Sequence, residues 1–248
     1  MTVVLVHGNP ETAAIWDPLR IELGRDDVVA LSPPGFGAPV PDGFGATADD
    51  YLAWLVGELE ALDGPIDLIG HDWGGGHVQR VAASRPDLIR SWCTDTAGAA
   101  DPEYVWHDMA RIWQTPGEGE ASVEAMISMP LEDQAAQLVA VGMTPDAARA
   151  CAAAVGPEMG RCILALYRSP AQPVMAEWGR ELEQAEYRPG LVVIATADPF
   201  TGGAAPARRS AERFGAEVAV LEGLGHWWML EDPTRAADAL RPFLDAPD

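Results

Sequence analysis

Short runs of apolar residues alternate along the chain with longer stretches in which apolar residues recur every three or four positions. The short runs are apolar nearly throughout and rich in β-branched residues, which is typical of strands buried on both faces of a sheet. We expect six strands, at Thr2–Val6, Val28–Leu31, Ile66–Ile69, Ile89–Thr94, Leu191–Thr196 and Val218–Leu221. The longer stretches predict helices, among them Thr47–Leu62, Val78–Ala83 and Pro233–Leu244. Strands that alternate with helices predict an α/β fold, in which a mostly parallel sheet is covered on both faces.

The stretch from Ala99 to Tyr187 breaks this alternation, because it has helical patterns and no convincing strand. Helices are expected there at Tyr104–Trp113, Ser122–Met129, Leu131–Val141, Pro145–Val155 and Pro157–Tyr167. The sequence therefore predicts a core built from residues 1–98 and 188–248, with a helical insertion over residues 99–187.

Composition limits the functions that such a fold can serve. The chain has 248 residues, 48% of them apolar, which suffices for one domain with an insertion. Its formal net charge is −22, from 38 acidic and 16 basic residues, and every basic residue is an arginine. A surface of this charge repels phosphate backbones and anionic lipid headgroups, so we expect no nucleic-acid partner and no membrane docking.

The cysteines and the first residues of the chain favour a cytoplasmic protein. The cysteines, Cys93, Cys151 and Cys162, are odd in number and fit no metal-site spacing, which indicates a reducing compartment. The N-terminal residues lack the basic start of a signal peptide, and no stretch approaches the roughly 18 apolar residues of a membrane span. We expect no cofactor and no metal site, since no cluster of histidines and carboxylates has ligand spacing.

The most informative segment is Gly70-His71-Asp72-Trp73-Gly74-Gly75-Gly76, which follows a predicted strand and precedes a predicted helix. The pattern Gly-x-nucleophile-x-Gly at such a junction is the nucleophile elbow, a strained turn that lifts one side chain above the sheet. Here that residue is Asp72. A carboxylate is already ionised at neutral pH, so it can displace a leaving group from saturated carbon and form an alkyl ester. Water must then hydrolyse the ester, which requires a base and an oxyanion hole.

At this point the chain resembles the α/β-hydrolase fold family, in the branch of epoxide hydrolases and haloalkane dehalogenases. Four motifs carry the resemblance, in this order: His7-Gly8-Asn9-Pro10, the elbow, Ala197-Asp198-Pro199-Phe200 and Gly225-His226-Trp227. The resemblance covers nearly the whole chain and makes the helical insertion the family's cap. The chain starts at what resembles the third family strand, so the resemblance implies a sheet of about six strands without the family's first two.

The resemblance also assigns roles. It makes His226 the base and an acid at the end of a strand its partner, for which Asp198 is preferred and Asp95 is the rival. It implies an oxyanion hole made by the backbone N–H groups of Asn9 and Trp73. The other histidines are expected to be structural: His7 in the oxyanion loop, His71 in the elbow, and His77 and His107 in helices.

Two leaving groups fit these residues. Relatives that release a halide use side-chain N–H donors, which Asn9 and Trp73 supply. Relatives that open an epoxide use cap tyrosines, and Tyr167 resembles the second of these. Met109 stands at the position of the first cap tyrosine. Tyr104 replaces that tyrosine only if it reaches the pocket from a different position in the cap.

The sequence thus predicts an epoxide hydrolase, with a haloalkane dehalogenase as the alternative. A non-catalytic ligand-binding protein of the same fold is disfavoured, because Asp72, Asp198 and His226 are all present. The acidic chain favours a small neutral organic substrate, with water as the second reactant. An anionic substrate would require arginines near the pocket to offset this charge; the closest candidates are Arg80 and Arg168, and the sequence places neither at the elbow. An uncovered edge strand would also permit a homodimer.

Overall fold

The computed structural model describes residues 1–170 and 173–246. Six parallel strands form one sheet in the order β2-β1-β3-β4-β5-β6. The strands are β1 (Thr2–Val6), β2 (Val28–Leu31), β3 (Ile66–Gly70), β4 (Ser91–Thr94), β5 (Gly190–Ala195) and β6 (Glu217–Leu221). The predicted α/β-hydrolase fold and its six-stranded parallel sheet are thereby confirmed.

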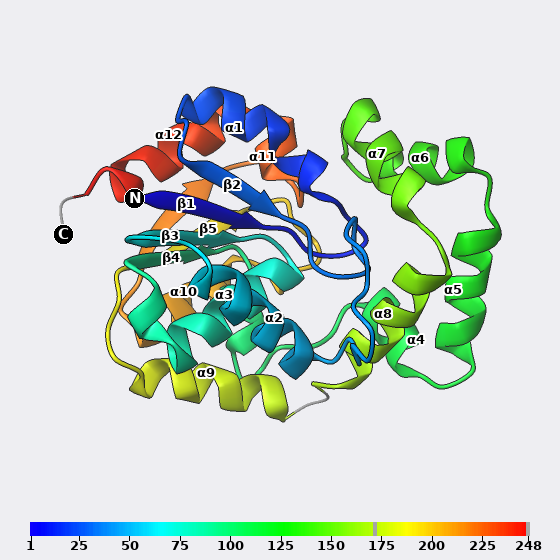
Figure 1. The fold of residues 1–248 in the computed structure, drawn as a ribbon, viewed down its shortest axis with the longest axis horizontal. Coiled ribbons are helices and arrows are strands. Elements are labelled where there is room, and N and C mark those ends of the chain that lie inside the picture. Colours follow the sequence, from blue (N-terminus) through cyan, green and yellow to red (C-terminus); the bar gives the residue numbers. More distant parts are fainter. Residues whose placement is uncertain (171–172, 247–248) are drawn as a thin grey trace.

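Helices cover both faces of this sheet. Figure 1 shows α1 (Asp17–Leu23) and α12 (Pro233–Leu244) on one side and α2 (Ala48–Glu60), α3 (Trp73–Ser84) and α9 (Val174–Gln184) on the other. Neighbouring residues of a strand point to opposite faces, so Val3 and Leu5 of β1 pack in the core beneath α1 and α12. Val4 and Val6 pack in the second core, together with residues of α2, α3 and α10 (Ala204–Phe214).

The remaining helices gather at one end of the sheet (Figure 1). They are α4 (Asp108–Gln114), α5 (Glu118–Ser128), α6 (Leu131–Ala140), α7 (Pro145–Ala154) and α8 (Pro157–Arg168), and the short α11 (Trp228–Glu231) precedes α12. A third apolar cluster joins α4 and α8 to the elbow, because Trp113 and Tyr167 pack with Trp73 and Tyr51. Helices α4 and α8 therefore lie against the segment that carries Asp72.

Several helices differ from the predicted ones, among them the helix expected at Ser122–Met129, which spans Glu118–Ser128. The helix expected from Tyr104 begins at Asp108, because the side chain of His107 accepts the backbone N–H of Ala110 and caps the helix there. Helix α9 was not expected, although its buried residues Met175, Ala176, Gly179 and Leu182 have helical spacing. Among the described residues, no helix is both long and apolar enough to cross a membrane.

Candidate active site

Asp72 lies at the turn between β3 and α3, at the carboxyl end of the sheet. Its φ of +52° belongs to a region that non-glycine residues rarely occupy, as a strained elbow requires. The turn is tight because α3 begins directly against β1: a Cβ on Gly74 would lie 2.2 Å from the carbonyl oxygen of Val6. The Asp72 side chain is 15% exposed, so its carboxylate reaches the surface of a pocket from an otherwise buried turn.

Backbone N–H groups stabilise one side of this carboxylate. The N–H of Asn9 donates to Asp72 Oδ1 at 3.0 Å, and the N–H of Trp73 also favours the ionised form. The loop comes this close only because residue 8 is glycine, since a Cβ there would lie 2.1 Å from Oδ1. Burial raises the pKa of Asp72 to about 6, against the opposing charge of His226. Asp72 is therefore mainly ionised at neutral pH.

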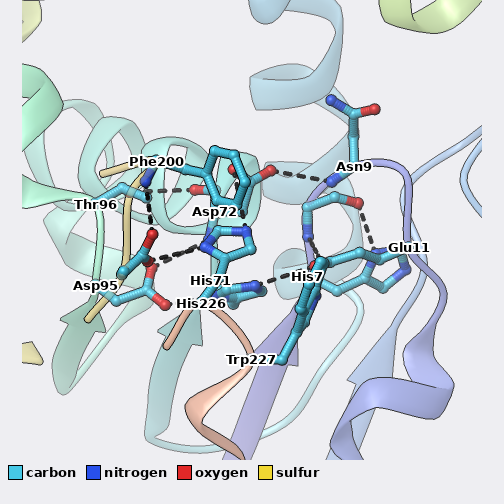
Figure 2. A network of polar contacts seen from close by, with 12 residues as sticks. His7, Asn9, Glu11, His71, Asp72, Asp95, Thr96, Phe200, His226 and Trp227 are labelled. Carbon is cyan, nitrogen blue, oxygen red and sulfur yellow. Dashed lines mark hydrogen bonds and ion pairs between the residues drawn. The ribbon is translucent and has the colours of Figure 1, made fainter. Parts of the chain in front are cut away.

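His226 faces Asp72 from the loop after β6. Its Nδ1 lies 2.9 Å from Asp198 Oδ2, and the other oxygen of Asp198 accepts the N–H of Phe200 at 2.7 Å. Asp198 thus fixes the ring with Nε2 directed at Asp72 Oδ2, at a distance of 4.0 Å. This distance exceeds a direct hydrogen bond. Asp72 and His226, which lie far apart in the sequence, are brought close together (Figure 2). Asp198 completes this array through its contact with His226.

Asp95 occupies a different place. Its Oδ1 accepts the backbone N–H of Asp72 at 3.1 Å, and its Oδ2 meets His71 Nδ1 at 2.5 Å and Trp228 Nε1 at 2.7 Å. Of the two acids that the sequence left in competition, Asp198 contacts His226 and Asp95 contacts the elbow. The two carboxylates therefore contact separate histidines, Asp198 on His226 and Asp95 on His71.

Seven of the 17 described residues that line the pocket above Asp72 are aromatic. They are Trp73, Tyr104, Trp106, His107, Tyr167, Trp178 and Phe200. Tyr167, on α8, packs edge-on against Trp73 with ring centroids 5.2 Å apart. Burial raises the pKa of Tyr167 well above its usual range, and a hydrogen bond with the Trp73 side chain opposes that rise. Its hydroxyl therefore stays protonated at neutral pH.

Tyr104 lies in the same pocket wall and supplies a second hydroxyl. It donates a long hydrogen bond of 3.4 Å to the carbonyl oxygen of Phe200, and burial raises its pKa. Met109, which takes the position of the first cap tyrosine in sequence, is 42% exposed and is not among the pocket residues. The pocket therefore contains two tyrosines, one of them placed differently from the family pattern.

His107 is a pocket residue that the sequence did not reveal. Its Nδ1 accepts the N–H of Ala110, which leaves Nε2 as the ring nitrogen available to a ligand. Burial lowers its pKa, so the ring is neutral at neutral pH and carries its proton on Nε2. The sequence signal that could have revealed this role is its place directly before Asp108, where a side chain that accepts a backbone N–H can cap a helix. His77 is a buried residue of α3, as expected.

The side chain of Asn9 differs from its backbone in environment. Asn9 is buried, and neither its Nδ2 nor its Oδ1 has a hydrogen-bond partner within the described residues. A buried amide without partners is costly, so it is a position where a bound group would be favoured. Its backbone N–H, in contrast, is engaged with Asp72.

Beneath Asp72 lies a buried polar cluster that the sequence analysis did not anticipate. Glu11, on the loop after β1, accepts from the N–H of Gly8 and from Trp227 Nε1, and its Oε1 lies 3.1 Å from His71 Nε2. Glu11, His71 and His226 bring ligand atoms within 4.8 Å of one another, a spacing that suits a metal ion. Both nitrogens of His71 face carboxylates, however, so the cluster is held together by its own hydrogen bonds.

One arginine also reaches the pocket. Arg80 lines it, stacks its guanidinium 4.3 Å above the ring of Trp178 and pairs with Asp49 at 2.6 Å. Arg168 is not a pocket residue and pairs with Glu120. The pocket is therefore mainly apolar, with a partly neutralised cation in its wall.

The sheet, the elbow and the Asp72–His226–Asp198 array define an α/β-hydrolase. Residues 3–239 match the sequence profile of the alpha/beta hydrolase family, and the chain belongs to that family.

Curated relatives carry several activities. The chain is 25% identical over 260 residues to 2-(acetamidomethylene)succinate hydrolase of Mesorhizobium japonicum, a match that covers 98% of this chain and 88% of the relative. It is 33% identical over 102 residues to an epoxide hydrolase of Caballeronia sordidicola, covering 36% and 29% of the two chains. It is 27% identical over 148 residues to a haloalkane dehalogenase of Bradyrhizobium diazoefficiens, covering 49% and 45%. The first curated relatives are also matched in part only, over 34% and 21% of their length.

Solved structures of the same fold superpose over nearly the full chain. The crystal structure of E-2-(acetamidomethylene)succinate hydrolase has a TM-score of 0.75 at 20% identity, covering 99% of this chain and 91% of the other. The Cif epoxide hydrolase from Acinetobacter nosocomialis has a TM-score of 0.78 at 18% identity, covering 98% and 82%. At these identities the likeness establishes the fold.

Proposed function

We propose that the protein hydrolyses epoxides to diols through a covalent ester on Asp72. One observation carries the proposal. An ionised carboxylate at the elbow has one oxygen held by the Asn9 N–H, while the other faces His226 at the base of a pocket walled by two tyrosines. That arrangement suits attack on a neutral, polarised carbon better than attack on an amide or ester, for which a hydroxyl or thiol is the usual nucleophile.

In the first step, Asp72 Oδ2 attacks an oxirane carbon and the ring C–O bond breaks. The electron pair goes to the oxirane oxygen, which takes a proton from a tyrosine hydroxyl. Tyr167 is the proposed donor, because it is protonated, buried and next to Trp73 in the pocket wall. Tyr104 is placed to supply a second hydrogen bond. The product of this step is a hydroxyalkyl ester of Asp72 and a tyrosinate.

In the second step, His226 Nε2 takes a proton from water, and the water oxygen attacks Cγ of Asp72. The negative charge that develops on Oδ1 is held by the backbone N–H groups of Asn9 and Trp73. The bond between Cγ and the alkyl oxygen then breaks. The diol leaves with the proton from His226, and Asp72 is released as a carboxylic acid with one oxygen derived from water. The proton of this acid passes through solvent to the tyrosinate, which restores both the Asp72 carboxylate and the tyrosine hydroxyl.

The alternative is a haloalkane dehalogenase, which the unpartnered Asn9 amide favours. In that reaction Asp72 displaces a halide, and side-chain N–H donors of Asn9 and Trp73 stabilise the departing ion. The two readings share the ester and its hydrolysis, and they differ only in the leaving group. Each reading has the support of one relative that matches over part of its length: an epoxide hydrolase for the first and a haloalkane dehalogenase for the alternative.

The discriminating experiment is a pair of substrate panels with matched carbon skeletons, aryl and alkyl epoxides against the corresponding bromoalkanes. Epoxide hydrolysis predicts diol formation, followed by chromatography, without bromide release. Bromide release without diol formation would replace the proposal by the alternative. The Asp72→Asn variant is the control for background hydrolysis in both panels.

A further inference from the structure

We propose that Glu11, His71 and Asp95 form a buried support for the proposed base, in which an imidazolium on His71 keeps the catalytic segments in register and limits how firmly His226 holds a proton. This triplet of Glu11, His71 and Asp95 makes its contacts beneath the pocket. The proposal rests on the proposed role of His226.

The geometry of the triplet requires a proton on each nitrogen of His71. The ring is fully buried, and Nδ1 and Nε2 meet carboxylate oxygens at 2.5 and 3.1 Å. Ionised carboxylates only accept hydrogen bonds, so both ring nitrogens must donate. Burial by itself lowers the pKa of His71, but Glu11 and Asp95 outweigh it and hold that pKa well above its ordinary value. The same pairing lowers the pKa of buried Glu11 to about 2.

The triplet contacts the three segments that carry Asn9, Asp72 and His226. Glu11 accepts the N–H of Gly8, directly before the oxyanion residue Asn9. Asp95 accepts the N–H of Asp72 itself. The indole N–H groups of Trp227 and Trp228, which follow His226 in the chain, donate to Glu11 and Asp95 (Figure 2 shows the first). Losing the central cation would leave two buried carboxylates facing each other and would loosen all these segments.

The triplet also acts on His226 electrostatically. The rings of His71 and His226 have their centroids 4.5 Å apart. Burial and the charge of His71 lower the pKa of His226, whereas Asp198 and Asp72 raise it, and the result lies above the ordinary value. Without the nearby cation, the two carboxylates would keep His226 protonated to still higher pH, and a protonated ring accepts no proton from water.

Within the described residues, the charged and titratable groups that face the two rings come from several segments. His226 is faced by Asp198 from the loop after β5, by Asp72 and His71 from the elbow, by Glu11 from the loop after β1 and by His107 across the pocket. His71 is faced by Glu11, Asp95, His226 and His7, and by the edge of the Trp16 ring. Burial lowers the pKa of His7 to about 4, so it adds no charge near neutral pH.

The first test measures the wild-type protein directly. Nitrogen-15 NMR of histidine-labelled protein reports which ring nitrogens carry protons, and single His→Gln variants assign the five signals. The triplet predicts that both nitrogens of His71 remain protonated from pH 6 to about pH 8, above the ordinary titration range of histidine. A His71 that loses one proton at or below pH 7 would overturn the proposal. This readout requires no turnover and no altered fold.

The second test removes the cation without changing the charge of the cluster. His71→Gln combined with Asp95→Asn leaves the triplet at −1, as in the wild type, but without the imidazolium. The pKa of His226, followed by the same NMR signals, should rise by at least about one unit at this separation. A folded double variant whose His226 titrates within about 0.3 unit of the wild type would contradict the electrostatic part. The matched control is His77→Gln, which removes a buried histidine that contacts Tyr51, outside the triplet, and should not move the pKa of His226.

The two proposals fail separately. A protein inactive toward both substrate panels, but with a permanently protonated His71, would remove the proposed function and leave the triplet intact. An active epoxide hydrolase with a neutral His71 would do the reverse.

Discussion

His226 and Asp198 are joined by a hydrogen bond of 2.9 Å between Nδ1 and Oδ2, across 28 residues of sequence. The bond fixes the tautomer of the ring so that Nε2 is the nitrogen directed at Asp72. Asp198→Asn replaces the accepting carboxylate by an amide and removes the negative charge that stabilises the imidazolium. We expect a loss of about 10³- to 10⁴-fold in kcat for ester hydrolysis.

The comparison for this variant is Asp95→Asn. Asp95 contacts His71 and the elbow, so its loss should reduce kcat much less than the loss of Asp198. Steady-state assays of both variants on one epoxide settle the order. If Asp95→Asn cost more, the role of partner to His226 would pass to Asp95.

Removing the hydroxyl of Tyr167 should slow the formation of the ester. Tyr167→Phe keeps the ring that packs against Trp73 but deletes the proposed proton donor. General acid catalysis contributes about 10²- to 10⁴-fold, and we expect a loss of kcat/KM toward the lower end, because Tyr104 remains in the pocket. Tyr187→Phe, at a side chain 64% exposed, is the control and should behave as the wild type. Unchanged rates for Tyr167→Phe would remove the role assigned to it.

The pH dependence of kcat/KM should report Asp72. Burial raises the pKa of Asp72 to about 6, and only the ionised carboxylate is a nucleophile. Therefore kcat/KM should be constant above about pH 7 and fall as the pH drops through about 6, approaching tenfold per unit below it. An acid limb near pH 4, the ordinary value for an aspartate, would show that the carboxylate is not desolvated in the free enzyme.

The glycine at position 8 should be needed for activity and not for folding. Gly8→Ala places a Cβ 2.1 Å from Asp72 Oδ1 and so displaces the carboxylate from the oxyanion N–H groups. We expect a loss of at least about 10²-fold in kcat, the magnitude seen when an oxyanion donor is removed. Gly57→Ala, on the exposed side of α2 with open space at its Cβ, should keep full activity and a similar Tm. Activity of Gly8→Ala near that of the wild type would argue against the oxyanion site.

The inner strands of the sheet, β1, β3, β4 and β5, were predictable because they are buried on both faces and therefore mostly apolar, as in Val3–Val6. The elbow was predictable because its glycines are imposed by backbone contacts, such as that of Gly74 with Val6. The contacts of Asp95 and Asp198 were not predictable from the sequence, because both residues follow strands. Only the three-dimensional path of the loop after β6 brings His226 to Asp198. The triplet was missed for the same reason: Glu11 lies 60 residues from His71, and nothing in either local pattern indicates the pairing.

The position of His107 could not be predicted from the sequence for a different reason. Its ring reaches the pocket because it ends an irregular segment and caps α4, whereas periodicity had placed it inside a helix. Tyr104 likewise lies outside the helix and reaches the pocket wall from that segment. The positions of side chains on irregular backbone depend on tertiary contacts, which hydrophobic periodicity does not encode.

The proposed mechanism requires that Asp72 form a covalent ester, which water hydrolyses with the help of His226. The most direct measurement is mass spectrometry of the His226→Gln variant after incubation with a substrate that the wild type turns over. We expect an adduct of the substrate's full mass for an epoxide, or of the alkyl group for a halide, on the peptide that contains Asp72. We also expect the adduct to be absent when Asp72 is replaced by asparagine. An active wild-type enzyme whose His226→Gln variant carries no adduct on that peptide, with any such substrate, would contradict the covalent mechanism.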